Sequence, residues 1–98
     1  MKIDATYLMV VFNNEARRVF LQVNNIFESV AMHISRTSDE NLFQQTKARY
    51  TDELKERLEI IFKNLKESHS DMQDMEQFSH RAKDAINYYL QQFLQYGN

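Results

Sequence analysis

Residues 5–34 carry a long run of apolar side chains at helical spacing. The apolar positions recur every three or four residues, as on one face of an α-helix, and the strict alternation of a strand is absent. The members of this stripe are Ala5, Leu8, Met9, Phe12, Ala16, Val19, Phe20, Val23, Ile26, Phe27, Val30 and Ile34. The pattern predicts a first helix over about residues 4–36, with the carboxylate of Asp4 as its N-cap.

The start of this predicted helix is apolar on all sides. Tyr7, Val10 and Val11 lie off the stripe, so residues 7–12 present no polar side chain in any direction. Either neighbouring helices cover this segment, or it forms a dimer or partner surface. Six apolar residues fall far short of the roughly 20 that span a bilayer, so no membrane span is expected.

A second helix is predicted over about residues 38–68, after a short polar break. Thr37 followed by Glu40 fits a capping box at this break. Lys47 interrupts the apolar stripe of this helix, Ile60 lies outside it, and a solvated, charged face fills the other side. The stripe consists of Phe43, Tyr50, Leu54, Leu58, Ile61, Phe62 and Leu65.

A third helix is predicted over about residues 71–96, with Ser70 as its N-cap and Gly97 as its stop signal. Its stripe consists of Met72, Met75, Phe78, Ala82, Ala85, Ile86, Tyr89, Phe93 and Tyr96. Tyr88 and Leu94 lie outside this stripe. Because tyrosine is common at protein interfaces, both are candidates for contact with a partner.

These elements predict an all-α, single-domain chain over residues 1–98, folded as an antiparallel three-helix bundle in up-down-up order. That order places the start of the first helix level with the end of the second, so Tyr7, Val10, Val11 and Ile60 are expected to gather at one end of the bundle. Both breaks lack glycine and proline. An alternative is therefore a two-helix hairpin that dimerises into a four-helix bundle, and self-association, as a homodimer, is expected in either case.

Composition narrows the function classes. The chain has no cysteine and no proline, its single glycine is Gly97, and its formal net charge is −2. Disulfides and cysteine nucleophiles are thereby excluded, and the charge balance argues against binding to nucleic acid. The N-terminal segment does not have the pattern of a signal peptide, so a cytoplasmic protein is expected, although a secreted protein without a leader would look the same.

Candidate chemistry is sparse in this sequence. Glu76 and His80 share one helical face, but a single such pair is too little for a metal site, and no cofactor or small-molecule substrate is indicated. Catalytic residues usually converge on loops, which this chain almost lacks, so it is not expected to be an enzyme. The sequence favours a small protein–protein interaction module, such as an adaptor, regulator, inhibitor or chaperone. The alternative is a structural or secreted bundle subunit that assembles with itself.

Overall fold

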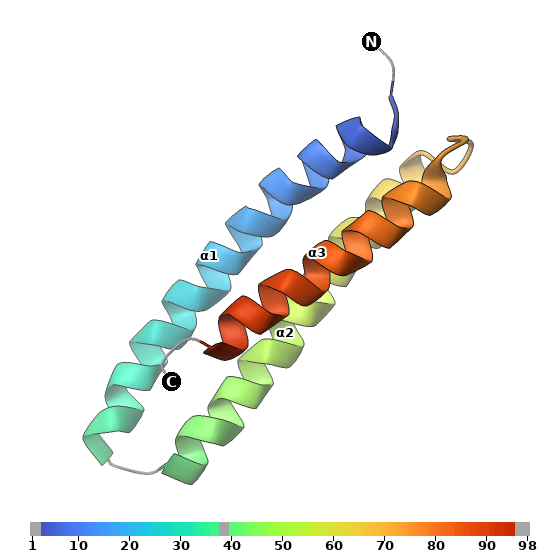
Figure 1. Ribbon diagram of the computed structural model, residues 1–98. Coiled ribbons are helices and arrows are strands. Elements are labelled where there is room, and N and C mark those ends of the chain that lie inside the picture. The colour runs from blue at the N-terminus through green and yellow to red at the C-terminus, as the bar shows by residue number, and fades with distance from the viewer. Residues whose placement is uncertain (1–2, 38–39, 96–98) are drawn as a thin grey trace.

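The computed structural model describes residues 3–37 and 40–95, with the backbone alone at 35–37. Three α-helices follow one another along the chain: α1 (Ala5–Thr37), α2 (Glu40–Ser68) and α3 (Met75–Gln95). Figure 1 shows α1 and α3 running in the same direction, with α2 antiparallel to both. All three helices pack on one another, which confirms the predicted all-α three-helix bundle.

The N-terminus of α1 has the predicted cap. The backbone N–H of Tyr7 donates to Oδ1 of Asp4 at 2.9 Å, and the N–H of Leu8 donates to the Asp4 carbonyl at 3.0 Å. The carboxylate thus accepts from one of the backbone N–H groups that have no partner in the first helical turn. The sequence prediction for this residue is confirmed.

The connection between α2 and α3 is longer than predicted. Helix α3 begins at Met75 rather than at residue 71, and residues 69–74 form a turn in which the Met72 N–H donates to the His69 carbonyl at 3.0 Å. The Phe78 N–H donates to the carbonyl of Asp74 at 3.2 Å, so Asp74, and not Ser70, precedes the first turn of α3. This turn also separates α2 from α3, so the alternative of one long hairpin helix is wrong.

A backbone carbonyl near the end of α2 has its hydrogen-bond partner in the same turn. Nδ1 of His69 lies 3.1 Å from the Leu65 carbonyl oxygen, which can only accept a hydrogen bond. The last carbonyls of a helix have no partner within it, and the His69 side chain is the hydrogen-bond partner of one of them. At the first break, the predicted Thr37–Glu40 capping box depends on the side chain of Thr37, which lies outside the described part of the structure, so it stays a prediction. Helix α2 is described from Glu40 onward.

Aromatic rings fill the core between the helices. Phe27 of α1 is fully buried, and its ring centroid lies 5.8 Å from those of Phe43 and Tyr50 and 5.3 Å from that of Phe93. This residue therefore contacts side chains from both other helices at one level. The predicted stripe of α1 is otherwise buried or half-buried, except that Ile26 is 49 % exposed. Ile26 is one residue from Phe27 and so lies about 100° around the helix from it.

Lys47 is a charged residue within the apolar stripe of α2. Its residue surface is only 4 % exposed, and its Nζ lies 6.0 Å from the centroid of the Phe43 ring. The burial lowers the pKa of the Lys47 amine from its ordinary value. The methylene groups of this side chain therefore complete the apolar stripe that the charged residue interrupts in the sequence pattern.

Candidate functional site

Two of the three predicted contact residues near the start of α1 are exposed. Val10 is 54 % exposed, Tyr7 is also exposed, and Val11 is half-buried. The start of α1 lies at the end of the bundle where the 69–74 turn also lies (Figure 1). This end therefore does carry apolar side chains on its surface.

Ile60 does not join these residues. Nη2 of Arg57 donates to Oε1 of Gln22 at 2.8 Å, so these two residues of the antiparallel helices α2 and α1 lie at about the same level. This register places Ile60 about level with Val19, which is roughly 12 Å along the helix axis from Val11. Ile60 is exposed. The expectation that it lies beside the start of α1 is wrong, because this hydrogen bond places it farther along α1.

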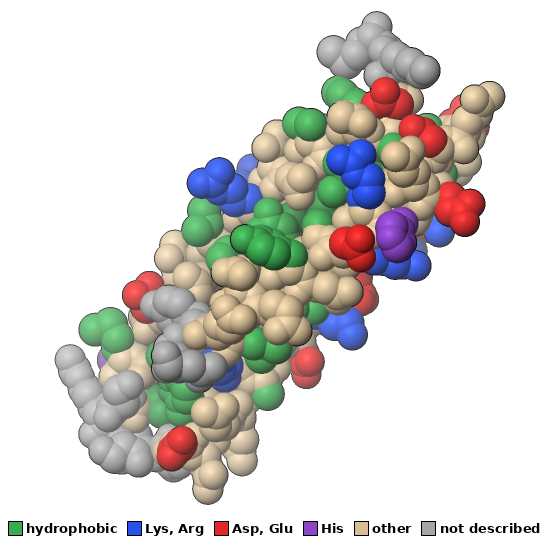
Figure 2. All heavy atoms as spheres, in the orientation of Figure 1, with side chains coloured by type: hydrophobic (Ala, Val, Ile, Leu, Met, Phe, Trp, Pro, Cys, Tyr) green, Lys and Arg blue, Asp and Glu red, His purple; other side chains and the backbone are tan. Residues whose placement is uncertain are grey.

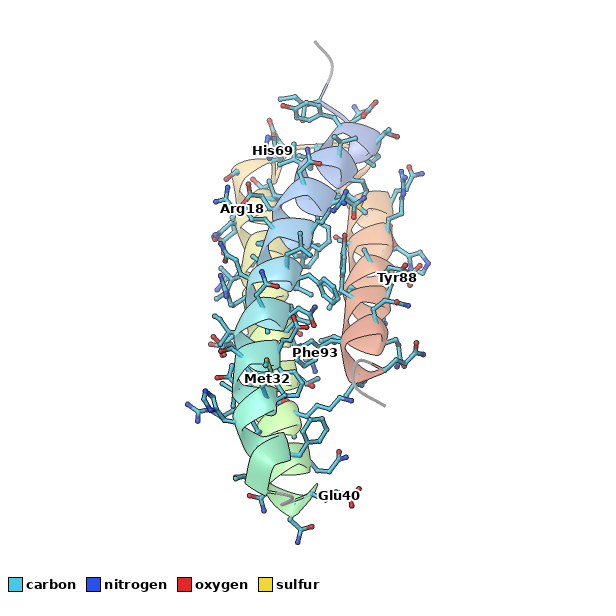
Figure 3. The ribbon with its side chains drawn as sticks, turned by 90° about the vertical axis from the view of Figure 1, so that its left-hand side faces the viewer. Arg18, Met32, Glu40, His69, Tyr88 and Phe93 are labelled. Atoms are coloured by element: carbon cyan, nitrogen blue, oxygen red, sulfur yellow. The ribbon has the colours of Figure 1, made fainter. Side chains whose placement is uncertain are left out.

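Tyr88 and Leu94 lie on different sides of α3. Six residues separate them along the helix, which corresponds to about 120° around its axis. Tyr88 faces the flank next to α1, where it lines a groove with residues of that helix. The two predicted contact residues of α3 therefore belong to separate surfaces, and Figure 3 shows Tyr88 about midway along α3.

The groove beside Tyr88 has a volume of about 310 Å³ and lies between α1 and α3. Leu21 and Tyr88 are the exposed apolar members of its lining, 48 % and 60 % exposed respectively. The Phe20 and Tyr89 rings pack 5.5 Å apart beneath them, and the Tyr88 and Tyr89 rings lie 5.7 Å apart. Burial raises the pKa of the Tyr89 phenol, against the opposing effect of the Arg17 charge. The result is an aromatic surface with one guanidinium at its edge.

Leu21 is a surface residue that sequence reasoning missed. It belongs to a line with Val10 and Met32 at intervals of 11 residues, and 11 residues fall within about 20° of three full helical turns. All three side chains are about half exposed or more, and Tyr7 lies close to the same direction. We call Tyr7, Val10, Leu21 and Met32 the outer face of α1. Figure 2 shows hydrophobic side chains at intervals along the α1 side of the molecule.

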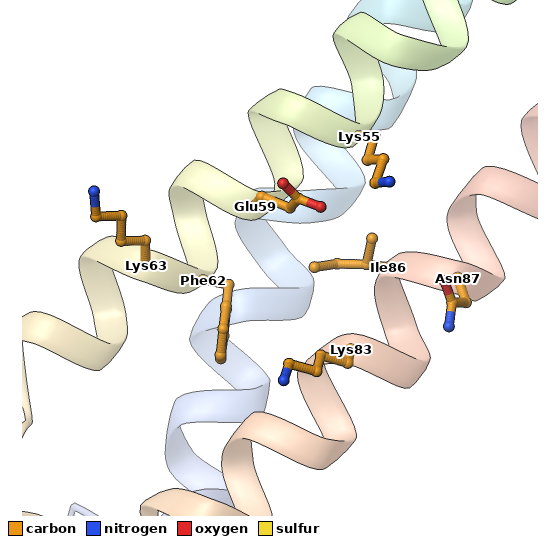
Figure 4. A pocket seen from close by; sticks show the side chains of 7 residues that line it. All are labelled: Lys55, Glu59, Phe62, Lys63, Lys83, Ile86 and Asn87. Carbon is orange, nitrogen blue, oxygen red and sulfur yellow. The ribbon is translucent and has the colours of Figure 1, made fainter.

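A second groove, of about 470 Å³, lies between α2 and α3 (Figure 4). Phe62 and Ile86 form its apolar floor, with Asn87 at one side. Its charged rim consists of Lys55, Glu59, Lys63 and Lys83. The sequence pattern of α2 predicts a solvated, charged face. A single helical pattern cannot show that Lys83 of α3 approaches this face.

His80, one of the two residues weighed for a metal site, lies close to a carboxylate of its own helix. Nε2 of His80 is 3.6 Å from Oδ2 of Asp84, and both side chains are largely exposed. Over residues 3–37 and 40–95, no group of three or more His, Cys, Asp or Glu side chains is placed to hold a metal ion. Glu76 and His80 both line an open hollow at the start of α3.

Comparison of the chain with protein-family models, with curated proteins and with solved structures gives no match. Among the described helices, none has a stretch that is long and apolar enough to cross a membrane. The residues of the molecule itself are therefore the basis for assigning a function.

Proposed function

We propose that this chain is a non-enzymatic protein–protein interaction module whose contact surface is centred on Leu21 and Tyr88. The observation that carries the proposal is the pairing of these two exposed apolar side chains at one groove, above the packed rings of Phe20 and Tyr89. Tyrosine and arginine are enriched among the residues that dominate binding energy at interfaces. This groove presents Tyr88 together with Arg17.

A second copy of the chain is the partner that this surface fits best. Val10 and Met32 each lie 11 residues from Leu21, so the line of exposed apolar side chains is symmetric about Leu21. Two α1 helices that cross antiparallel at Leu21 would place Val10 of each copy against Met32 of the other. A twofold axis through Leu21 therefore matches Val10 with Met32, and Leu21 with its own copy, as a closed dimer requires.

The polar residues of the same face suit this arrangement. Around the same axis Glu28 meets Asn14 of the second copy, and Arg17 meets Asn25. Each of these charged side chains thus faces an amide group, which can donate to a carboxylate or accept from a guanidinium. No like charges are brought together in these pairs, and like-charge contacts are the usual electrostatic obstacle to self-association.

The proposal is tested by sedimentation over a concentration series. We expect the parent chain to approach dimer mass as concentration rises, and the double variant Leu21→Ser, Tyr88→Ser to remain a monomer. A matched control is Ile60→Ser, Leu94→Ser, which removes exposed apolar side chains from other surfaces and should behave as the parent does. A monomeric parent at every concentration, or a double variant that dimerises like the parent, would refute the proposal.

A second candidate function is that of a structural subunit that assembles without limit. The exposed apolar residues outside the Leu21–Tyr88 surface, Leu42 and Ile60 among them, favour it because they could support further contacts. A twofold contact closes on itself, so the first proposal requires growth to end at two copies. Growth past a dimer in the same concentration series would favour the structural subunit instead.

A further inference from the structure

We propose that the groove between α2 and α3 binds an acidic amphipathic helical segment of a partner protein. The floor of the groove consists of Phe62 and Ile86, and Figure 4 shows Ile86 pointing from α3 toward α2. Lys55 and Lys83 extend from the two helices toward each other's side of the groove, whereas the Nζ of Lys63 points away from it. This surface lies between α2 and α3, so the inference is independent of the dimer centred on Leu21.

The charge of the groove is opposite in sign to that of the whole chain. Three lysines and one glutamate line it, and the Nζ of a fourth lysine, Lys66, lies 5.8 Å from the centroid of the Phe62 ring. Three of the six lysines of the chain thus line the groove and a fourth lies next to it, in a protein whose formal net charge is −2. Across the described residues, no ion pair engages the amines of these lysines.

The apolar floor and the lysine rim together determine which kind of partner fits the groove. Carboxylates complement the lysine rim, and an apolar side chain complements the floor, so the partner must carry both on one face. An amphipathic helix meets this requirement, because residues three and four apart share a face. The floor offers only two apolar side chains and is open to solvent along its length, so an acyl chain laid on it would stay largely in water.

The two lysines that reach across the groove give a direct test. The probe is a fluorescein-labelled synthetic helical peptide with a leucine stripe flanked by glutamates, and its control has glutamine in place of every glutamate. Fluorescence anisotropy with the full chain should show binding of the glutamate peptide and much weaker binding of the glutamine peptide. The double variant Lys55→Glu, Lys83→Glu should bind the glutamate peptide roughly tenfold more weakly or worse, since two favourable charge contacts become repulsive.

A matched control uses the same charge change on the same two helices. Arg49 and Arg81 are exposed and lie on faces of α2 and α3 turned away from Lys55 and Lys83. The variant Arg49→Glu, Arg81→Glu should bind the peptide within about twofold of the parent, because it has the same net charge change but an intact groove. Should the glutamate pair in the groove prevent folding, Lys55→Gln, Lys83→Gln serves in its place, with circular dichroism as the check.

Three results would overturn the inference. The first is equal binding of the glutamate and glutamine peptides, and the second is an equal loss of binding in the groove variant and the arginine control. The third is binding of the parent to phosphatidylserine vesicles without binding of the glutamate peptide, which would assign the lysines to an anionic surface. None of these results depends on the oligomeric state, so a failure here is distinguishable from a failure of the proposed dimer.

Discussion

The backbone N–H of Ala5 donates to Oδ2 of Asp74 at 3.0 Å, although 69 residues separate the two along the chain. Asp74 directly precedes α3, and its own carbonyl accepts from the Phe78 N–H. Its carboxylate therefore lies beside the positive N-terminal ends of two parallel helices, α1 and α3. The Asp74 side chain therefore links the start of α1 to the 69–74 turn.

Removal of this carboxylate should weaken the contact between the ends of α1 and α3. Asp74→Ala deprives the Ala5 N–H of its acceptor, and losses of this kind cost about 1 kcal/mol of unfolding free energy. Urea unfolding followed by circular dichroism would measure the change. Asp71→Ala is the control, because Asp71 is an exposed residue of the same turn. Equal effects of the two substitutions would show that the Ala5 contact contributes nothing.

Truncation of Phe27 should destabilise the fold strongly. Its ring contacts Phe43, Tyr50 and Phe93, so Phe27→Ala leaves a cavity at the level where all three helices meet. Phenylalanine-to-alanine changes in cores cost about 3–5 kcal/mol, a large part of the stability of a small domain. The control is Ile26→Ala at the adjacent exposed position, with an expected loss below about 1 kcal/mol. Comparable losses in the two variants would contradict the central place of Phe27 in the core.

The buried amine of Lys47 should give stability a distinct dependence on pH. Burial lowers its pKa below the ordinary value of 10.5, so between the two values the unfolded chain binds more protons than the folded chain. The unfolding free energy contributed by Lys47 therefore rises with pH across that interval. Lys47→Met removes this titration while keeping the apolar stem.

The comparison of parent and variant isolates the effect of Lys47. We expect the unfolding free energy of Lys47→Met minus that of the parent to fall as pH rises from neutral toward 10.5, because only the parent gains stability there. Urea unfolding at a series of pH values measures this difference. A difference that stays constant or increases with pH would show that the Lys47 amine is not desolvated by folding.

Much of this fold is readable from hydrophobic periodicity alone. The three stripes predict three helices, and residues such as Phe12, Leu54 and Phe78 are buried where the pattern places them. Capping at Asp4 is equally local, since its partner is three residues away. The sequence pattern places the start of α3 too early, at residue 71, whereas the helix begins at Met75. The Asp74 side chain before it accepts from the N–H of Ala5, and a contact between residues so distant in sequence leaves no periodic signal.

The candidate surfaces were harder to predict, because they depend on register and on neighbouring helices. The position of Ile60 depends on how α2 slides along α1, which the Arg57–Gln22 hydrogen bond reports and no single helical pattern contains. The lysine groove needs Lys83 brought beside Lys55 by the packing of α3 on α2. Leu21 was overlooked because a lone leucine between polar residues is common on protein surfaces.

The antiparallel geometry of the proposed dimer makes its own prediction. Because the chain has no cysteine, single cysteines can be introduced without background. A mixture of Val10→Cys and Met32→Cys chains should form a mixed disulfide between the two variants, in excess of either homodimer. Mass spectrometry after mild oxidation separates the three products. A parallel pairing of α1 helices would instead favour the two homodimers, and this result would exclude the antiparallel axis.

The most direct test of the proposed interaction surface is disulfide formation by Leu21→Cys alone. A twofold axis at Leu21 brings this residue close to its own copy, within the short reach that a disulfide allows. We predict that Leu21→Cys forms a covalent dimer on mild oxidation, whereas Ile60→Cys, at almost the same exposure, stays mainly monomeric on a non-reducing gel. A Leu21→Cys chain that remains monomeric, or that crosslinks no faster than Ile60→Cys, would contradict the account.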